Sequence, residues 1–218
     1  MVSVRQYSCT DEQIAVWLRG LLSISWADGH FDPEEQALIT TLMEEDLVPS
    51  IDPGSAATIS PTELAASLGQ DPQMAENFLR TAVMVAIADG TYSLPEDELL
   101  HQFCTALGQQ TEVLEPLRLT LSDRPNSLST SPPEHLLSPM QDWLDHLEVQ
   151  DPRLARFLCK MIPSQCPFER DVTLFGRKII YIPPMCKINP LYEQLVGLRF
   201  RALSYLADDC QEDVAKYC

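Results

Sequence analysis

Apolar residues recur at helical spacing through the first 120 residues of the chain. The first apolar stripe consists of Ile14, Trp17, Leu18, Leu21 and Leu22. Thr10 stands three residues before Gln13, which is the spacing of a capping box, so we expect a helix to begin here and to end at the turn Asp28-Gly29. No segment of this part alternates with the period of a half-buried strand, so the pattern predicts an all-helical first domain.

Further helix starts follow in the same part. Each combines a capping side chain with a proline at the first helical position, where no amide hydrogen is needed. They lie at Asp32-Pro33, Ser60-Pro61 and Asp71-Pro72. The helix after Asp32 would bury Leu38, Ile39, Leu42 and Met43.

An internal repeat is visible when the chain is shifted by 61 residues without a gap. It aligns Trp17-Leu18-Arg19 with Phe78-Leu79-Arg80, Ala27-Asp28-Gly29 with Ala88-Asp89-Gly90, Phe31 with Tyr92, Asp32 with Ser93, and Glu35 with Glu96. Each copy reads as a helix, a tight turn and a capped second helix, and neither copy buries its apolar stripe alone. We therefore expect the copies to pack as a pseudo-symmetric bundle. Cys104 falls on a core position and is expected to be a small buried hydrophobe.

The Ala-Asp-Gly turn followed by a capped acidic helix, present twice, resembles the TerB-like domain of the tellurite-resistance family over residues 10–122. The resemblance implies a compact helical domain with a role in stress-linked protein assemblies. It also implies a cluster of acidic residues suspected of binding a divalent cation. By position these are Asp28, Asp32, Glu35, Asp89 and Glu96. Ser93 replaces one aspartate of a symmetric set, and the alternative is that the pairs Asp32/Glu35 and Ser93/Glu96 are capping boxes beside two stabilised turns.

Charge divides the 218-residue chain into two parts. Residues 1–150 hold 24 acids and 5 bases, whereas residues 151–218 hold 8 acids and 10 bases, within a total net charge of −17. An acidic chain is repelled by phosphate, so nucleic acid is not expected as a partner, and a protein partner with a basic surface is. The division predicts a dipolar molecule whose ends meet different partners or each other.

No window of the sequence has the length and apolar character of a membrane-spanning helix, and the N-terminus lacks the apolar run of a signal peptide. A cytoplasmic protein without a transmembrane segment is expected. Peripheral membrane contact and the oligomeric state stay open. An apolar content of 45% is enough for a packed core.

The second part differs from the first in composition and in the elements that it predicts. Residues 123–137 are rich in serine and proline and are expected to link a first domain, 1–122, to a second, 138–218. The second domain shows helix starts at Ser138-Pro139, Asp151-Pro152 and Asn189-Pro190, and a β-hairpin over residues 171–182. The last helix would bury Leu191, Leu195, Leu198, Ala202, Tyr205 and Leu206 and leave Glu193, Arg199 and Arg201 in solvent. The expected fold class is mainly α: a pseudo-symmetric TerB-like helical bundle followed by a small α-rich domain with one short β-hairpin.

Four cysteines lie on or near the connections between the elements of this second domain: Cys159, Cys166, Cys186 and Cys210. In a reducing compartment such a density favours metal binding or redox chemistry over disulfides. The spacing is not that of a C-x-x-C knuckle, but Cys166-Pro167 is similar to cluster ligands that precede proline. An Fe–S cluster or a structural zinc is one interpretation. The other is that Cys159 and Cys210 are core residues and the remaining two are free thiols.

The segments Gln165-Cys166-Pro167, Pro183-Pro184-Met185-Cys186 and Leu198-Arg199-Phe200-Arg201 look like the family labelled Mo-dependent nitrogenase C-terminal domain over residues 140–217. The family is mainly cyanobacterial, and its label implies no nitrogenase activity. What the resemblance implies is an accessory role in a photosynthetic or nitrogen-fixing bacterium.

No catalytic constellation is evident. The histidines form no metal-ligand pair, and the motifs of serine hydrolases, zinc proteases and dinucleotide enzymes are absent from the sequence. An enzyme is therefore not favoured. The first functional hypothesis is an accessory scaffold or assembly factor that docks a partner through its acidic helices. The alternative is a redox protein or Fe–S carrier that uses the C-terminal cysteines.

Overall fold

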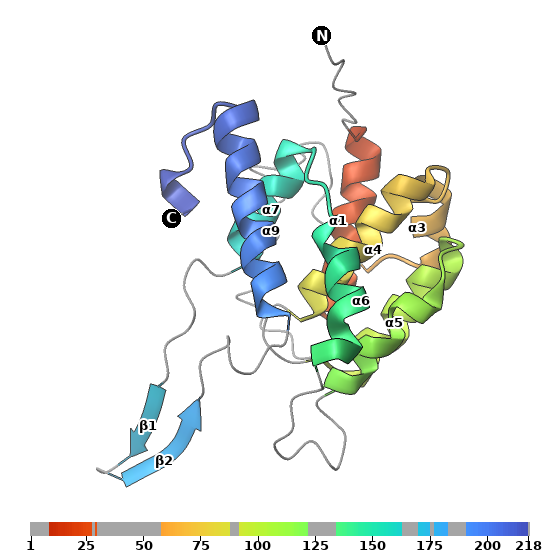
Figure 1. Cartoon of the computed structure of the whole chain (residues 1–218). Coiled ribbons are helices and arrows are strands. Elements are labelled where there is room, and N and C mark those ends of the chain that lie inside the picture. The colour runs from red at the N-terminus through yellow and green to blue at the C-terminus, as the bar shows by residue number, and fades with distance from the viewer. Residues whose placement is uncertain are drawn as a thin grey trace.

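The computed structural model describes residues 9–27, 29, 58–87, 92–121, 134–162, 170–174, 177–182 and 191–217. The fold is mainly helical, as the sequence predicts (Figure 1). Among the described residues, every helix is too short or too polar to cross a bilayer.

The first part contains the helices α1 (Asp11–Ser25), α3 (Pro61–Leu68), α4 (Pro72–Ala86) and α5 (Leu94–Ala106), and then the 3-10 turns η3 (Thr111–Val113) and η4 (Glu115–Thr120). The predicted starts at Thr10, Ser60 and Asp71 are confirmed, because each side chain accepts a hydrogen bond from an amide of the first turn. Gly29 has a φ of +73°, which is the left-handed conformation that suits glycine in the turn expected after α1. The expected start at Asp32-Pro33 lies outside the described residues.

Helices α1 and α4 have the same length, and α4 begins 61 residues after α1. Trp17 of α1 and Phe78 of α4 are equivalent in the repeat, and their rings meet edge to face with centroids 5.8 Å apart. Phe78 also meets Phe103 of α5 at 5.8 Å. Cys104 is fully buried, as predicted. The first-copy counterpart of α5 lies outside the described residues.

The second part contains α6 (Glu134–Asp145), α7 (Pro152–Met161), α9 (Tyr192–Ser204), a π-helical turn η5 (Tyr205–Asp209) and a 3-10 turn η6 (Ala215–Tyr217). Strands β1 (Arg170–Leu174) and β2 (Arg177–Ile182) pair in antiparallel fashion, with an irregularity after Val172. The predicted start of α7 is confirmed, since Asp151 caps it. Helix α9 begins with Leu191 as its N-cap, and Asn189-Pro190 lie outside the described residues.

The prediction that a helix begins at Ser138-Pro139 is wrong. Helix α6 begins at Glu134, so Pro139 lies inside it and removes one backbone hydrogen bond. The apolar stripe of α6 explains why the helix extends upstream. Leu137 and Met140 are both buried, so the turn before the proline contributes to the core and offsets the lost bond.

A second correction concerns Arg199 and Arg201, which were both expected in solvent. Arg201 is half-buried, with its Nε and Nη2 atoms out of contact with solvent. Arg199 is buried more completely. The side chain of Arg199 is 8% exposed and donates hydrogen bonds to the carbonyls of Cys159, Ile162 and Tyr217. The first two carbonyls lie at the C-terminal end of α7, where backbone oxygens lack helical partners. Arg199 therefore ties α9 to the end of α7 and to the chain's last described residue.

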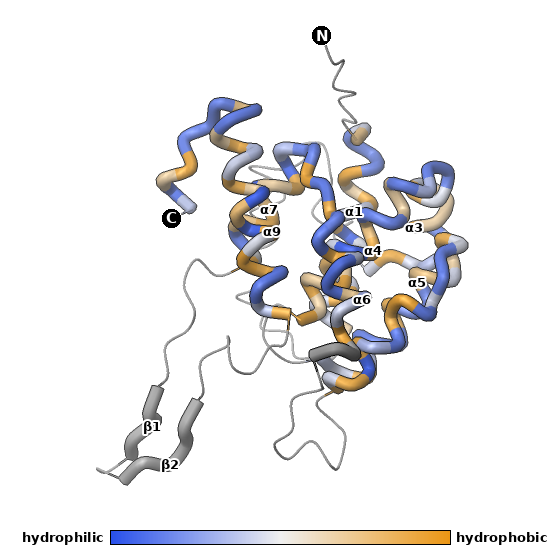
Figure 2. Tube along the Cα trace, in the orientation of Figure 1, coloured by the Kyte–Doolittle hydropathy of each residue, from blue (hydrophilic) through white to orange (hydrophobic). Residues whose placement is uncertain are grey.

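One hydrophobic core joins the two parts of the chain. Figure 2 shows hydrophobic and hydrophilic residues alternating along the helices, as expected for helices that each bury one face. Helix α1 contacts α7, and α6 contacts both α9 and η4. Most of the expected linker, 123–137, lies outside the described residues, but the segments on either side of it pack against each other.

An ion pair joins α7 to the C-terminal tail and leads to a pH prediction. Arg156 donates to Glu212 at 2.9 Å, and this bond, with one from Lys216, lowers the pKa of Glu212. A carboxylate with a lowered folded-state pKa stabilises the fold above the ordinary glutamate value of about 4.3, and this contribution is lost as the pH falls through the folded value. We expect Glu212→Gln to lower the free energy of unfolding by about 0.5–1 kcal/mol at neutral pH.

In urea unfolding, the gap between this variant and the wild type should shrink as the pH falls through the lowered pKa of Glu212, because the carboxylate then becomes protonated in the folded state as well as in the unfolded state. Glu193→Gln on α9 is the control, because Glu193 is exposed and has no ion pair among the described residues. A gap for Glu212→Gln that persists unchanged at acidic pH would contradict the prediction.

Candidate functional site

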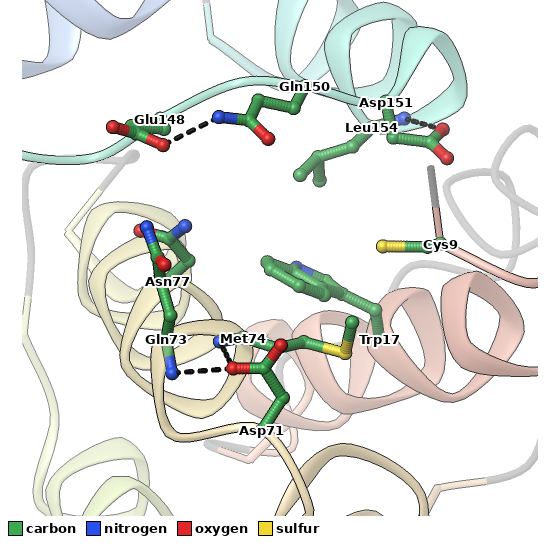
Figure 3. A pocket seen from close by; sticks show the side chains of 10 residues that line it. All are labelled: Cys9, Trp17, Asp71, Gln73, Met74, Asn77, Glu148, Gln150, Asp151 and Leu154. Carbon is green, nitrogen blue, oxygen red and sulfur yellow. Dashed lines mark hydrogen bonds between the residues drawn. The ribbon is translucent and has the colours of Figure 1, made fainter. Parts of the chain in front are cut away.

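A small pocket of about 40 Å³ lies where the first part of the chain meets the second (Figure 3). One side comes from the start of α1 and from α4, and the other from the segment between α6 and α7 together with the first turn of α7. The first side consists of Cys9, Trp17, Asp71, Gln73, Met74 and Asn77. The second side consists of Glu148, Gln150, Asp151 and Leu154.

Two helix N-termini open onto this pocket. Oδ1 of Asp71 accepts from the amides of Gln73 and Met74, at 2.9 and 3.3 Å, and so caps α4. Asp151 caps α7 in the same way. Both sites follow the Asp-Pro pattern in which the carboxylate satisfies free amides and the proline needs none. Two capping carboxylates, 80 residues apart in the sequence, are thereby brought to one place.

Arg153 links the two parts at one end of the pocket. Its guanidinium donates to Asp151, to Asp11 at the start of α1, and to the carbonyl of Cys9. The hydrogen bond with Asp151 is the main reason why the pKa of Arg153 is raised. This base therefore compensates the charge of Asp151 and holds the N-terminal segment on α7.

Arg80 makes a second link between the parts. Its Nε donates to the carbonyl of Trp143 in α6 at 2.8 Å, and its Nη2 pairs with Glu76 at 2.8 Å. The indole of Trp143 also donates to Glu76, at 2.9 Å, and lies 5.3 Å from the guanidinium. A cation over an aromatic face and a shared carboxylate hold α4 against α6.

The pocket combines one buried hydrogen-bond donor that has no partner among the described residues with two acids that form no ion pair there. The indole Nε1 of Trp17 is buried and has no hydrogen-bond partner among the described residues. Asp71 and Glu148 have no ion pair in the described part of the chain. Burial, followed by the charge of Asp151, raises the pKa of the Cys9 thiol to about 11. At neutral pH this thiol is protonated and weakly nucleophilic, so the arrangement suits recognition better than covalent chemistry.

The four cysteines of the predicted metal site are only partly within the described residues. Cys159 is buried in α7, and Cys210 is half-buried beyond η5, where its thiol lies beside Tyr205. Cys166 and Cys186 lie outside the described residues. Over the ranges that the structure describes, no three histidine, cysteine or acidic side chains are grouped to hold a metal ion. Convergence of the four cysteines stays a prediction.

The predicted acidic cluster has one described member. The Glu96 carboxylate accepts from the amide and the hydroxyl of Ser93, at 2.8 and 2.7 Å, and forms a capping box at the start of α5. That contact agrees with the alternative interpretation, in which Ser93 and Glu96 form a capping box. The other members, Asp28, Asp32, Glu35 and Asp89, lie outside the described residues.

Sequence reasoning missed a buried carboxylate next to this capping box. Asp97 is 1% exposed and accepts from Tyr92 at 3.0 Å and from Nε of Arg118 at 3.0 Å. Burial, together with this carboxylate, raises the pKa of Tyr92. Asp97 ties α5 to η4. The one signal in the sequence was that Asp97 has no acidic counterpart in the first copy of the repeat.

Sequence reasoning also missed the pocket. It treated Asp71 and Asp151 as helix caps and Trp17 as a core residue, and each interpretation is correct as far as it goes. The available signal was the indole of Trp17, since a buried tryptophan N–H usually needs a hydrogen-bond partner.

The comparison with known families concerns the second part of the chain. Residues 136–218 match the family model Mo-dependent nitrogenase C-terminus. The match begins within α6 and includes Cys159, Cys210 and Arg199. It covers less than half of the chain. No curated protein and no solved structure matches the chain.

Proposed function

We propose that this protein is a non-enzymatic accessory protein, a scaffold or assembly factor, whose acidic helices dock a protein partner with a basic surface. The observation that carries the proposal is the ion pairing of the basic side chains in the first part. Every described base before residue 122 is ion-paired with an acid of the same part, so none remains to offset the exposed carboxylates.

The pairs are Arg19–Glu63 at 2.7 Å, Arg80–Glu76 at 2.8 Å and Arg118–Asp97 at 3.0 Å. Three exposed acids, Glu12, Glu98 and Glu112, have no ion pair among the described residues. Glu98 lies on α5, and Glu112 lies in η3, which packs on α5. A negative field on this side attracts basic surfaces and repels phosphate, so a basic protein is the expected partner and nucleic acid is not.

The family context supports the same proposal. We propose that residues 1–122 form a TerB-like domain and that residues 138–218 form the accessory domain of a cyanobacterial family, in a cytoplasmic protein. The first resemblance implies a role in stress-linked protein assemblies, and the second implies an accessory role. A divalent cation at Asp28, Asp32, Glu35, Asp89 and Glu96 remains part of the proposal for the first domain.

Salt dependence tests the docking proposal. Surface charge is screened over roughly 10 Å at 0.1 M salt and over about 3 Å at 1 M salt. We expect partners captured from the source cells on the immobilised full chain at low salt to be basic proteins and to elute as the salt rises. Capture that is unchanged at high salt, or of acidic proteins alone, would count against docking through the acidic helices.

An alternative function is a redox protein or an Fe–S carrier. The supporting observation is that α7, which holds Cys159, packs against η5, which ends next to Cys210. With Cys166 and Cys186 these thiols are the proposed ligands of an Fe–S cluster or zinc. A cluster that is reducible, or that transfers to an acceptor, would favour this alternative over a purely structural site.

Metal analysis tests the cysteine site. Anaerobically purified protein should contain iron with sulfide, or zinc, and Cys166→Ser with Cys186→Ser should abolish the metal content. Cys104→Ala is the control and should retain the metal, because Cys104 lies in the core of the first part. Colourless, metal-free protein with four titratable thiols at these positions would exclude the site.

A further inference from the structure

We propose that the pocket between α1, α4 and residues 148–154 binds a small organic ammonium that carries a carbonyl oxygen next to its amine. An α-amino amide and the amino terminus of a peptide chain both have this chemistry. The inference is independent of docking through the acidic helices, because it rests on the interior of the pocket.

The need for an acceptor comes from Trp17. Its side chain is 3% exposed, and its Nε1 is buried with no partner among the described residues. Figure 3 shows the indole ring projecting into the space between the two sides of the pocket. Buried N–H groups are nearly always hydrogen-bonded, so an oxygen supplied by a ligand would satisfy this donor.

The need for a positive charge comes from the acids. Three of the lining residues are acids, and no base lines the pocket in the described part of the chain. Arg153 pairs with Asp151, and Arg80 of α4 interacts with the charge of Glu148 without forming an ion pair with it, so Asp71 is the acid with the least compensation. Oδ1 of Asp71 already satisfies the first amides of α4, so its other oxygen is available to a new donor. An ammonium group, with three donors and no acceptor, matches these oxygens.

The size of the space limits the ligand. A pocket of about 40 Å³ admits roughly three water molecules at about 10–15 Å³ each. An amine, one carbon and one carbonyl group fit this volume, and a longer molecule would extend outward. Met74 and Leu154 provide apolar contact for the carbon. Because the ligand would touch both parts of the chain, its binding would also stabilise their association.

Glycinamide is the probe, used with the full chain at about pH 6.5, below the pKa of an α-amino group. The readout is the NMR signal of the Trp17 indole N–H, which should shift saturably as the acceptor arrives. The chain's other indoles, those of Trp26 and Trp143, should not shift. Ethylammonium lacks the carbonyl and acetamide lacks the charge, so each should bind about tenfold more weakly than glycinamide.

Two variants keep the proposal falsifiable. Asp71→Asn preserves the helix cap, since asparagine caps as well as aspartate, but removes the charge, and it should weaken glycinamide binding about tenfold. Trp17→Phe keeps a ring against Phe78 and removes the N–H, and it should weaken binding about fivefold, measured by calorimetry. Glu12→Gln is the control, because Glu12 is exposed, has no ion pair among the described residues and does not line the pocket.

Glycyl-alaninamide separates the two sources of the ligand. Tighter binding than glycinamide assigns the pocket to the amino terminus of a chain, and weaker binding assigns it to a free small amine. The proposal is overturned if glycinamide up to about 100 mM, well above the Kd expected for so small a ligand, leaves the Trp17 signal unmoved. It is also overturned if acetamide or ethylammonium binds equally well, or if Asp71→Asn binds like the wild type.

Discussion

Replacing Arg199 with methionine is expected to lower the free energy of unfolding by about 3–5 kcal/mol, the largest loss of any single substitution considered. The guanidinium is buried and serves three backbone carbonyls, those of Cys159, Ile162 and Tyr217. A buried carbonyl left without a partner costs about 1–3 kcal/mol. The variant would leave carbonyls unpaired at the end of α7 and in the C-terminal tail at once.

Arg201→Met is the matched control, two residues further along α9. Nη1 of Arg201 donates to the carbonyl of Asp145 at 3.0 Å, but its Nε and Nη2 are buried without a partner among the described residues. Burial lowers the pKa of this guanidinium. Its removal should change the free energy of unfolding by less than about 1 kcal/mol in either direction. Urea unfolding followed by circular dichroism compares the two variants, and equal losses would contradict the role assigned to Arg199.

Gly20→Ala is expected to destabilise the first part by about 1–3 kcal/mol through overpacking. A Cβ at this position of α1 would lie 2.8 Å from the ring of Phe78 and 2.9 Å from Cδ1 of Leu64. The ring of Phe78 cannot move away easily, because it is fully buried and packs against Trp17 and Phe103. The glycine is therefore what lets α1 approach α4 and α3 closely.

Gly197→Ala provides the comparison, because Gly197 also lies inside a helix but would place its Cβ in open space. Alanine is the better helix former by up to about 1 kcal/mol, so this variant should be neutral or more stable. Thermal unfolding of both variants measures the difference. A Gly20→Ala protein as stable as Gly197→Ala would show that α1 and α4 are not tightly packed at this point.

The sequence predicted the helical architecture where local chemistry decides it. Thr10, Ser60, Asp71, Ser93 and Asp151 all cap helices at the positions that their spacing indicates. A cap is visible in sequence because its partners are the amides of the next three residues. The edge-to-face pair of Trp17 and Phe78 likewise lies at equivalent positions of a repeat that the sequence shows.

Predictions from the sequence failed where contacts between distant segments determine the structure. Pro139 looks like a helix start, but burial of Leu137 extends α6 by another turn. Arg199 looks like a solvent residue, but three carbonyls from two other segments surround it. The pocket is built from α1, α4 and the start of α7, and spacing along the chain carries no information on that meeting.

The docking surface is the central claim, and charge reversal at Glu98 and Glu112 tests it most directly. Both are exposed acids without an ion pair among the described residues, and Glu193→Lys with Asp208→Lys makes the same charge change on the second part. Binding of the partner captured at low salt is then measured for the wild type and the two double variants. The account predicts at least a tenfold weaker association for Glu98→Lys with Glu112→Lys, and wild-type affinity for the control. Equal affinities for both double variants, or a loss in the control alone, would contradict docking through the acidic helices.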